Sequence, residues 1–522
     1  MAVFKLKKKE AELAVGQDLL AVLPDNPKPW YRTRHLLILN LMLLIPMLSP
    51  AAYGYDGSMV NGLQTLPQWW EYFNQPSASI LGAMNAMYPV GKFIGVLPTT
   101  WLSDRYGRKP PMYIGLVVLI IGAAIQGAAQ NLAMFIVGRF LVGLGAAFVS
   151  QPSPILVTEL AYPTHRGKVT GLLYTTYWIG ALLAAWITFG TFRMSNSSWS
   201  WRIPSLLQGL IPLIQLCFIY FVPESPRWYI AQGRHEEARK VLTKWHAGGD
   251  ESSPLVAFEM ENMAQHIRAE TGVQSQVTYL DLIKTAPNRK RTFISFVVGL
   301  AGTWAGQAVI SYYLALVLKT IGINEAKDQT LINGMLQLWN FLASVFAGAL
   351  LIDRVGRRML FLICGGGMLV SYIIWTILSS VFDRTKEPGV GHSVVAFVFI
   401  YSFFYDIGII PLLQTYPVEI FPYALRGRGF TVSLASTYIG LIIGQVVNPI
   451  ALGNIGWKYY IVFCILIFIF LVIVYFMFPE TRAKSLEEIA EVFGDAKTHT
   501  GLDTKAVLDE EKEPVGEFER VR

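Results

Sequence analysis

Three charged residues, Asp56, Lys92 and Asp406, stand within or at the end of stretches that are otherwise apolar. A charge at membrane depth is costly, and it usually marks an ion or substrate path or a buried ion pair. Lys92 lies twelve residues before the next charge, Asp104, and at about 1.5 Å per helical residue this separation is about 18 Å. That depth is too great for its ammonium to reach the membrane surface easily. We therefore expect Lys92 either to pair with a carboxylate such as Asp406 or Glu159, which is favoured, or to bind an acidic group on a substrate.

The composition is that of a polytopic membrane protein. Of the 522 residues, 53% are hydrophobic and 15% are charged, whereas about 25% are charged in soluble domains. Leu36 to Tyr55 is twenty residues without a charge and Pro110 to Gly138 is twenty-nine, and about 20 apolar residues suffice to cross a bilayer as a helix. The net charge of +7 does not indicate nucleic-acid binding, because the basic residues fall in alternate loops. No nucleophile–base pair, phosphate loop or metal-ligand spacing occurs outside the apolar spans, so we expect no enzyme, no cofactor and no metal.

The apolar spans predict an all-α protein with twelve transmembrane helices. Twelve spans place every basic loop cluster, and both termini, on the cytoplasmic side. The expected helices are 35–56, 78–101, 111–130, 132–155, 168–190, 203–222, 293–318, 329–352, 358–380, 393–416, 428–449 and 457–478. The expected domains are a cytosolic arm at 1–34, a six-helix bundle at 35–222, a cytosolic linker with short helices at 223–290, a second six-helix bundle at 291–478 and a cytosolic tail at 479–522.

A charge-dense turn occurs twice, about 250 residues apart. Residues 104–108 read Asp-Arg-Tyr-Gly-Arg and residues 353–357 read Asp-Arg-Val-Gly-Arg. The segment 159–166 has a counterpart at 419–426, and Pro-Glu-Ser at 223–225 has a counterpart in Pro-Glu-Thr at 479–481. Repeats of this length predict two halves with one architecture, which is the usual construction of a secondary transporter.

The repeated turns predict a charged latch at the cytosolic ends of the helices. Acids and bases at matching positions in both halves could pair when the inner gate closes and separate when it opens. The alternative is that these are ordinary cytoplasmic loop charges. The candidate gate residues are Asp104, Arg105, Arg108, Glu159, Arg166, Asp353, Arg354, Arg357, Glu419 and Arg426.

Several of these motifs together resemble the sugar porter family of the major facilitator superfamily. The resemblance rests on the Asp-Arg-x-Gly-Arg pair, on Pro-Glu-Ser-Pro-Arg-Trp at 223–228 and on Pro-Glu-Thr with Leu-Glu-Glu between 479 and 488, and it covers about residues 35–490. Asn-Gly-Leu at 61–63 and Ser-Tyr-Tyr-Leu at 311–314 are similar to the fungal branch of lactose, cellodextrin and hexose permeases. The resemblance implies the major facilitator fold of two six-helix bundles, a sugar site at the midplane and alternating access.

The resemblance also implies a role for Asp56. Proton-coupled members of the family carry Asp at this position, passive facilitators often carry an amide, and Arg139 in the fourth helix is the matching basic partner. Proton binding to Asp56 would release Arg139 and permit the conformational change. The alternative is that Asp56 is an interfacial residue at the outer end of the first helix.

A sugar site needs amides and hydroxyls for the sugar hydroxyls, and flat aromatic faces for the C–H surfaces. Where the seventh helix of the family carries a glutamine pair and an asparagine, this chain has one amide, Gln307. The substrate therefore stays open between a glucose-like sugar, a disaccharide and a non-sugar polyol. The candidate substrate-binding residues are Tyr174, Trp178, Thr303, Gln307, Tyr312, Tyr313, Gln337, Asn340, Gln414 and Thr437.

The leading hypothesis is a proton-coupled sugar symporter that works as a monomer in the plasma membrane, with a sugar, protons and the lipid bilayer as its partners and no nucleic acid. The alternatives are a passive facilitator or an exporter of a sugar-like or secondary metabolite, and a non-transporting sugar sensor, which is less favoured because the tail is short. Asn196, in Asn-Ser-Ser at 196–198, is a glycosylation candidate in a predicted outer loop.

Overall fold

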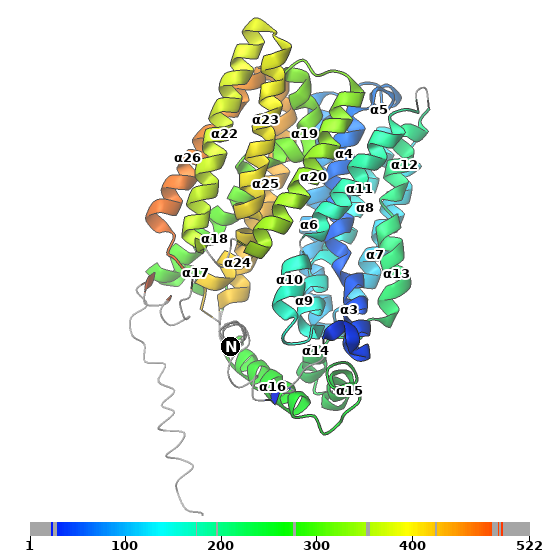
Figure 1. The fold of residues 1–522 in the computed structure, drawn as a ribbon, viewed down its shortest axis with the longest axis vertical. Coiled ribbons are helices and arrows are strands. Elements are labelled where there is room, and N and C mark those ends of the chain that lie inside the picture. Colours follow the sequence, from blue (N-terminus) through cyan, green and yellow to red (C-terminus); the bar gives the residue numbers. More distant parts are fainter. Residues whose placement is uncertain are drawn as a thin grey trace, which may run out of the picture.

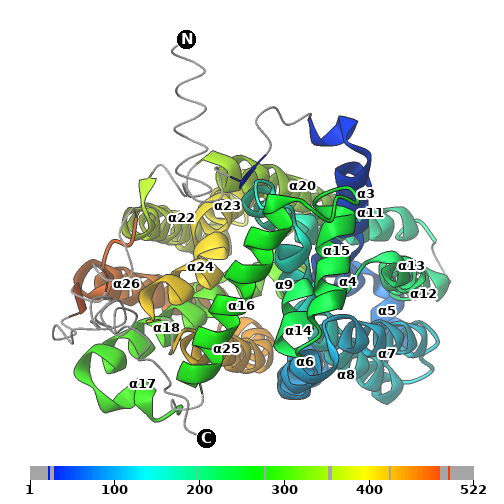
Figure 2. The ribbon, with the colours of Figure 1, turned by 90° about the horizontal axis from the view of Figure 1, so that it is seen from below.

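The computed structural model of the chain is built of helices in the residues that it describes. These residues are 22–23, 29–173, 175–194, 197–274, 278–350, 355–422, 425–482, 489 and 492–493. The helices form two groups that lie side by side, one from each half of the chain (Figure 1). Seen from one end, α16 (Pro254–Gln274) of the connecting segment runs across the molecule between the two groups (Figure 2).

The N-terminal group contains six spans, each made of one helix or of two or three consecutive short helices. They are α3 (Arg34–Met47) with α4 (Ser49–Thr65), α6 (Ala78–Tyr106), α7 (Lys109–Gly127), α8 (Leu132–Ser150) with α9 (Pro152–Leu160), α10 (Arg166–Leu173) with α11 (Thr176–Thr191), and α12 (Trp199–Leu207) with α13 (Leu210–Phe218) and η2 (Ile219–Phe221). The short helix α5 (Pro67–Tyr72) follows the first span. Prolines at the helix junctions, such as Pro50 and Pro152, lack the N–H that a continuous helix would need.

The C-terminal group repeats this arrangement. Its spans are α18 (Ala286–Trp304) with α19 (Gln307–Thr320), α20 (Ala326–Leu350), α22 (Arg357–Thr385), α23 (Pro388–Phe404) with η3 (Tyr405–Ile409) and α24 (Ile410–Ile420), α25 (Arg426–Ile455) and α26 (Tyr459–Met477). The connecting segment contains α14 (Pro226–Ala231), α15 (His235–Trp245), α16 and α17 (Asp281–Lys284). We call the end with these four helices the linker end, and the end with α5 and the α22–α23 connection the far end (Figure 1).

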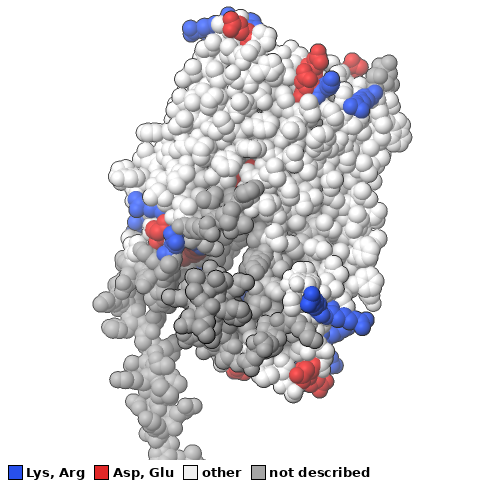
Figure 3. Space-filling model, in the orientation of Figure 1, with Lys and Arg blue, Asp and Glu red and all other residues white. Residues whose placement is uncertain are grey.

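By length and apolar composition, nine helical segments of the described residues could cross a membrane. One of them, Arg426–Met477, contains both α25 and α26, which are separated by the 3-10 turn η5 (Gly456–Lys458), where Gly456 has a φ of 54°. With α10–α11 and α20 the spans number twelve, so the prediction of an all-α fold with twelve helices in two bundles is confirmed. Figure 3 agrees with a membrane protein, because charged side chains gather toward the two ends of the face shown and most of the surface between them is uncharged.

The predicted end of the first helix at Asp56 is wrong. α4 continues to Thr65, so Asp56 lies inside the helix and is 0% exposed. The continuation is stable because its polar side chains are used at an interface: Asn61 Nδ2 donates to Ile310 O at 2.8 Å and Gln64 Nε2 donates to Tyr312 O at 3.0 Å. Asp56 is therefore not an interfacial residue.

These same contacts hold the two halves together at the far end. Asn61 Nδ2 also donates to Ser311 O at 2.7 Å, and Leu314 N donates to Asn61 Oδ1 at 3.0 Å. The predicted seventh helix is broken into α18 and α19 at Gly306, which has a φ of 102°. The carbonyls are accessible because α19 is also kinked at Tyr313, whose φ of −136° and ψ of 21° are not helical. In this structure, helix α4 of the first half thus fastens to α19 of the second.

Candidate functional site

Asp56 and Arg139 form an ion pair inside the N-terminal bundle. Arg139 Nη2 lies 3.3 Å from Asp56 Oδ2, Nη1 lies 3.4 Å from Oδ1, and both side chains are 0% exposed. Gln208 Nε2 donates to Asp56 Oδ1 at 2.9 Å, and Arg139 Nε donates to Met84 O at 3.2 Å. The paired charges satisfy each other where water is excluded, and removal of either charge would leave its partner uncompensated.

Lys92 lies at the boundary between the two bundles rather than in an ion pair. Its Nζ stands 4.3 Å from the ring centroid of Tyr53 on α4 and 5.6 Å from that of Tyr438 on α25. Cation–π contacts of this kind contribute about 0.5–2 kcal/mol each. Among the described residues no carboxylate lies within ion-pair distance of Lys92, so the favoured pairing with Asp406 or Glu159 is not formed in this structure.

Asp406 lies on the other side of the boundary, in the π-helical turn η3, and is 1% exposed. Asn340, with its amide oriented so that Nδ2 is the donor, donates to Asp406 Oδ2 at 3.1 Å and to Leu336 O at 3.2 Å. Within the described residues, Asp406 Oδ1 is a buried oxygen without a hydrogen-bond partner. A π turn interrupts the regular backbone and is often found at functional sites.

Aromatic side chains connect these groups across the boundary. The rings of Tyr53 and Tyr177 have centroids 5.9 Å apart. A methyl group placed on Gly57 would lie 3.4 Å from the Tyr177 hydroxyl and 3.9 Å from the ring of Tyr312. Tyr177 from α11 and Tyr312 from α19 therefore both lie beside Gly57, one residue away from Asp56. Hydroxyls and ring faces from both halves stand together there, as a site that binds a hydroxylated ligand would require.

Three of the predicted substrate ligands have hydroxyls that are bonded to backbone. Thr303 Oγ1 donates to Leu300 O at 3.1 Å, Thr437 Oγ1 donates to Gly299 O at 3.1 Å, and Tyr313 Oη donates to Gln445 O at 2.7 Å. The last two bonds join α18 or α19 to α25. Thr437 and Tyr313 thus connect helices in this structure, whereas the bond of Thr303 lies within α18. The expected role of all three as ligands stays a prediction.

Of the predicted amides, Gln307 lies on α19, Gln337 and Asn340 lie on α20, and Gln414 lies on α24. Gln307 Nε2 donates to Ser311 Oγ at 3.2 Å, while its Oε1 is buried without a partner in the described residues. Gln337 Nε2 donates to Asn333 Oδ1 at 3.2 Å within α20. Trp178 is 4% exposed, and its ring packs edge-on against Tyr177 at 5.0 Å. The described residues do not include Tyr174, the side chain of Gln414, or Asn196 of the glycosylation sequon.

Sequence reasoning missed four contributors. Gln208 bonds Asp56, and Tyr53, Tyr177 and Tyr438 surround Lys92 or connect it to Tyr312. Gln208 could have been found as one of two amides, with Gln215, within the predicted span 203–222. The three tyrosines gave no such signal, because aromatic residues are common packing residues in apolar helices.

At the linker end, three carboxylates bind the first repeated turn. Glu224 accepts hydrogen bonds from Arg108 N and Lys109 N, each at 3.0 Å, at the start of α7. Arg108 pairs with Glu159 at 3.3 Å and with Asp104 at 3.1 Å. The charges thus connect the start of α7 to the end of α9.

The second repeated turn copies the first. Glu480 accepts from Arg357 N at 2.8 Å and from Arg358 N at 3.1 Å, and Arg357 pairs with Glu419 at 3.1 Å. The matching glycines Gly107 and Gly356 have φ values of 105° and 94°, which favour glycine, and a Cβ would strike the carboxylates of Glu224 and Glu480. The motif is therefore a carboxylate bound at a helix N-terminus, formed once in each half.

Of the predicted latch residues, Arg108 pairs with Asp104 and Glu159 in the first half, and Arg357 pairs with Glu419 in the second. Arg105 lies over the rings of Trp101 and Tyr106 at 5.5 and 5.6 Å. Arg166 and Arg426 begin α10 and α25, whereas Asp353 and Arg354 lie outside the described residues. Opening and closing of a latch by these charges stays a prediction.

Replacing Glu480 by glutamine is expected to lower the free energy of unfolding by about 1–2 kcal/mol, because the helix N-terminus of α22 loses a charged acceptor. Burial of Glu480 raises its pKa, but the N–H groups of Arg482, Arg357 and Arg358 together outweigh burial and lower the pKa below its usual value. The stabilisation is therefore present at neutral pH and is lost as the pH falls through that lowered pKa. Thermal unfolding of the purified protein in detergent measures it. Glu236→Gln, an exposed acid in α15, is the control, and equal melting temperatures for both variants and the parent would contradict the assignment.

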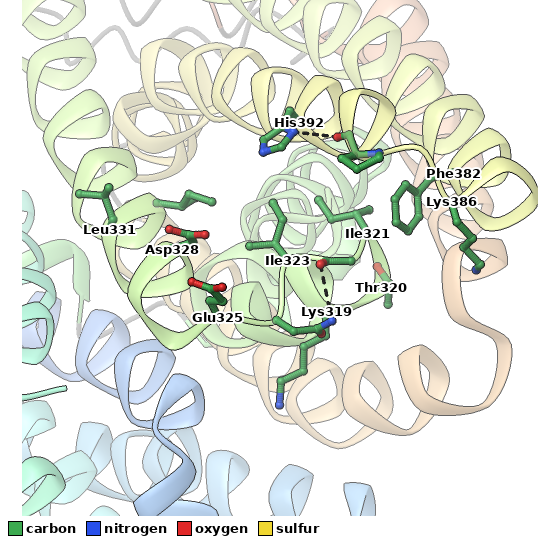
Figure 4. A pocket seen from close by; sticks show the side chains of 14 residues that line it. Lys319, Thr320, Ile321, Ile323, Glu325, Asp328, Leu331, Phe382, Lys386 and His392 are labelled. Carbon is green, nitrogen blue, oxygen red and sulfur yellow. Dashed lines mark hydrogen bonds between the residues drawn. The ribbon is translucent and has the colours of Figure 1, made fainter. Parts of the chain in front are cut away.

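A separate hollow of about 770 Å³ lies at the far end of the C-terminal half. It is lined by the ends of α19 and α22 and the starts of α20 and α23, and Figure 4 shows the carboxylates of Glu325 and Asp328 on one side of it and Lys386 on another. None of the candidate substrate-binding residues that the structure describes lines this hollow. We do not assign the substrate site to it.

Comparisons with known proteins agree with this arrangement. The sequence profile of a family described as "Sugar (and other) transporter" matches residues 42–493. The "MFS-type transporter oryC" of Aspergillus oryzae is 30% identical, over 84% of this chain and 82% of that protein. The "High-affinity glucose transporter" of Kluyveromyces lactis is 28% identical over 88% and 86%, and the "Quinate permease" of Neurospora africana is 28% identical over 94% and 95%.

Solved structures resemble the fold. The inward open conformation of the xylose transporter XylE from E. coli superposes with a TM-score of 0.71 at 22% identity, over 87% of this chain and 99% of that one. A XylE structure described as a proton:xylose symporter bound to 6-bromo-6-deoxy-D-glucose gives 0.69 at 21% identity, over 87% and 99%. At this level of identity the likeness concerns the architecture.

Proposed function

Because the chain belongs to the sugar (and other) transporter family of the major facilitator superfamily, we propose that it is a proton-coupled symporter of sugars or sugar-like hydroxylated molecules. Family membership makes it a multi-pass membrane transporter and not an enzyme. The observation that carries the proposal of proton coupling is the Asp56–Arg139 pair, a carboxylate and a guanidinium that are both fully buried at the centre of the N-terminal bundle.

The contacts of α4 support a specific coupling step. While Asp56 is ionised, it attracts Arg139 and accepts from Gln208, which connects α4 to α8 and to the turn between α12 and α13. A proton on Asp56 removes that attraction, so α4 is free to shift. α4 also carries Asn61 and Gln64, which fasten the far end to α19. Protonation in the middle of α4 can therefore bias the opening of the far end, and release of the proton favours its closure.

The orientation and organisation are part of the proposal. The linker end is cytoplasmic, because the repeated turns with Arg108 and Arg357 lie there, and the far end faces outward in the plasma membrane. The halves at 35–222 and 291–478 move against each other as rigid bundles, joined by the linker at 223–290, with the arm at 1–34 and the tail at 479–522 in the cytosol. One chain contains both halves and works as a monomer.

Accumulation driven by a proton gradient tests the proposal. The full chain, reconstituted in proteoliposomes, would be given labelled glucose, xylose, lactose and cellobiose with an outside pH of 5 and an inside pH of 7.5. We expect at least one substrate to accumulate above its outside concentration, and a protonophore to abolish the accumulation. Uptake that only equilibrates, with or without the protonophore, would instead support the passive facilitator.

A further inference from the structure

We propose that Lys92 binds a carboxylate of the substrate, so that the transported molecule is a hydroxylated monocarboxylic acid, of the sugar-acid class, rather than a neutral sugar. This inference rests on the proposed function, since it names the substrate of the same transport path. The coupling step does not involve Lys92. The favoured prediction, that Lys92 pairs with a protein carboxylate, is not met among the described residues.

Within the N-terminal half, the buried charges Asp56, Arg139 and Lys92 leave one positive charge in excess. Asp56 is close enough to interact with Lys92 electrostatically, but both of its oxygens already face Arg139 and one also accepts from Gln208. Glu159 pairs with Arg108 at the linker end. Asp406 belongs to the opposite bundle, where it accepts from Asn340. A positive charge at membrane depth is costly without a partner, and an anionic substrate supplies that partner.

The aromatic rings contact the Lys92 ammonium but do not accept hydrogen bonds from it. Tyr53 and Tyr438 approach Nζ with ring faces, at 4.3 and 5.6 Å, and a ring face accepts no conventional hydrogen bond. The ammonium has three N–H donors, so donors stay available for carboxylate oxygens. Since Tyr53 belongs to the N-terminal half and Tyr438 to the C-terminal half, an anion bound here contacts the surface where the two bundles meet.

The opposite bundle offers acceptors for substrate hydroxyls. Among the described residues, Asp406 Oδ1 and Gln307 Oε1 are buried oxygens without a hydrogen-bond partner, on side chains that are 1% and 6% exposed. Buried acceptors without donors are unfavourable, and the hydroxyl groups of a substrate are donors. A molecule with a carboxylate at one end and hydroxyls along the rest therefore complements Lys92 on one side and Asp406 and Gln307 on the other.

Uptake of matched acids and sugars by two lysine variants tests the inference. Labelled gluconate, galacturonate and quinate would be compared with glucose and galactose in proteoliposomes containing the parent chain, Lys92→Met or Lys92→Arg. We expect the parent to accumulate at least one acid. Lys92→Met should lower kcat/KM for that acid by about 30-fold or more, because one partner of a buried charge pair is lost, while Lys92→Arg keeps much of the activity. Neutral-sugar transport, if present, should fall by less than twofold.

Lys244→Met is the matched control, because Lys244 also lies over an aromatic ring, that of Trp245 at 4.9 Å, but in the linker helix α15. Retention of the parent's melting temperature by Lys92→Met shows that the variant is folded, and quenching of tryptophan fluorescence by the acid measures binding without transport. Loss of binding in a folded Lys92→Met variant supports the inference.

The other outcomes separate the two proposals. Proton-driven uptake of a neutral sugar with no uptake of any acid would overturn the role of Lys92 and leave the proposed function standing. Equal losses for sugar and acid in Lys92→Met would make Lys92 a structural residue and overturn the inference as well. Absence of proton-driven uptake for every sugar and acid would overturn both.

Discussion

Replacing Asp56 by asparagine is expected to abolish accumulation of the substrate while leaving its exchange across the membrane intact. Asparagine keeps the size of the side chain and its oxygen can still face Arg139, but it carries no negative charge and binds no proton. The variant therefore resembles the protonated state throughout the cycle, in which α4 is not bound to Arg139 by charge. Substrate can still drive both changes of conformation, so labelled substrate inside exchanges with unlabelled substrate outside.

The expected effect is large because the driving force is lost entirely. A difference of about two pH units supports about 100-fold accumulation when one proton accompanies one substrate. In Asp56→Asn the ratio of inside to outside concentration should fall to one, independent of pH. Time courses of uptake in proteoliposomes, followed by counterflow with preloaded substrate, measure the two activities on one preparation.

Asp250→Asn is the control for Asp56→Asn, because Asp250 is an exposed acid whose hydrogen bonds are to Ser252 in the linker. It should accumulate substrate as the parent does. If Asp56→Asn still concentrates its substrate at acid pH, the coupling proton binds elsewhere, and Asp406, buried with one oxygen unpartnered in the described residues, would be the next carboxylate to replace.

The helices could be predicted from the sequence because each span is a long run without charge between charge-dense turns. The first span shows where that rule fails. The sequence predicts that this helix ends at Asp56, because the charge-free run ends there. In the structure the helix continues, because Arg139 neutralises Asp56 inside the bundle. The polar residues that follow, Asn61 and Gln64, donate hydrogen bonds to the backbone of the other half. These are tertiary contacts, which the local sequence around Asn61 and Gln64 does not predict.

The candidate site was predictable in part, for a related reason. A carboxylate is so costly in an apolar span that Asp56 was predicted to be functional from its type, whereas Arg139 was predicted as its partner from the family resemblance. A threonine or tyrosine carries no such cost. Tyr313 was expected to face the substrate, yet in this structure its hydroxyl bonds Gln445 O on α25, while the unremarked Tyr177 stands beside Asp56 and Tyr312. Which face of a helix meets the other bundle is decided by how the helices pack.

Replacing Gly143 by valine is expected to reduce transport to background by separating α8 from α6. A Cβ at Gly143 would lie 2.0 Å from Tyr88 O and 2.8 Å from Tyr88 C. These are backbone atoms, which cannot rotate away, so the two helices must move apart. Overpacking of this kind costs about 1–3 kcal/mol, and a lower melting temperature in detergent should accompany the loss of transport.

The consequence reaches the coupling pair because Gly143 lies about one helical turn after Arg139. Arg139 donates to Met84 O on α6, and its guanidinium lies 5.9 Å from the ring centroid of Tyr88. Moving α8 away from α6 therefore withdraws the support that orients Arg139 toward Asp56. Gly190→Val is the control, since a Cβ at Gly190 on α11 meets nothing within 4 Å. Parent-like melting and accumulation in Gly143→Val would mean that this close approach of α6 and α8 does not position the pair.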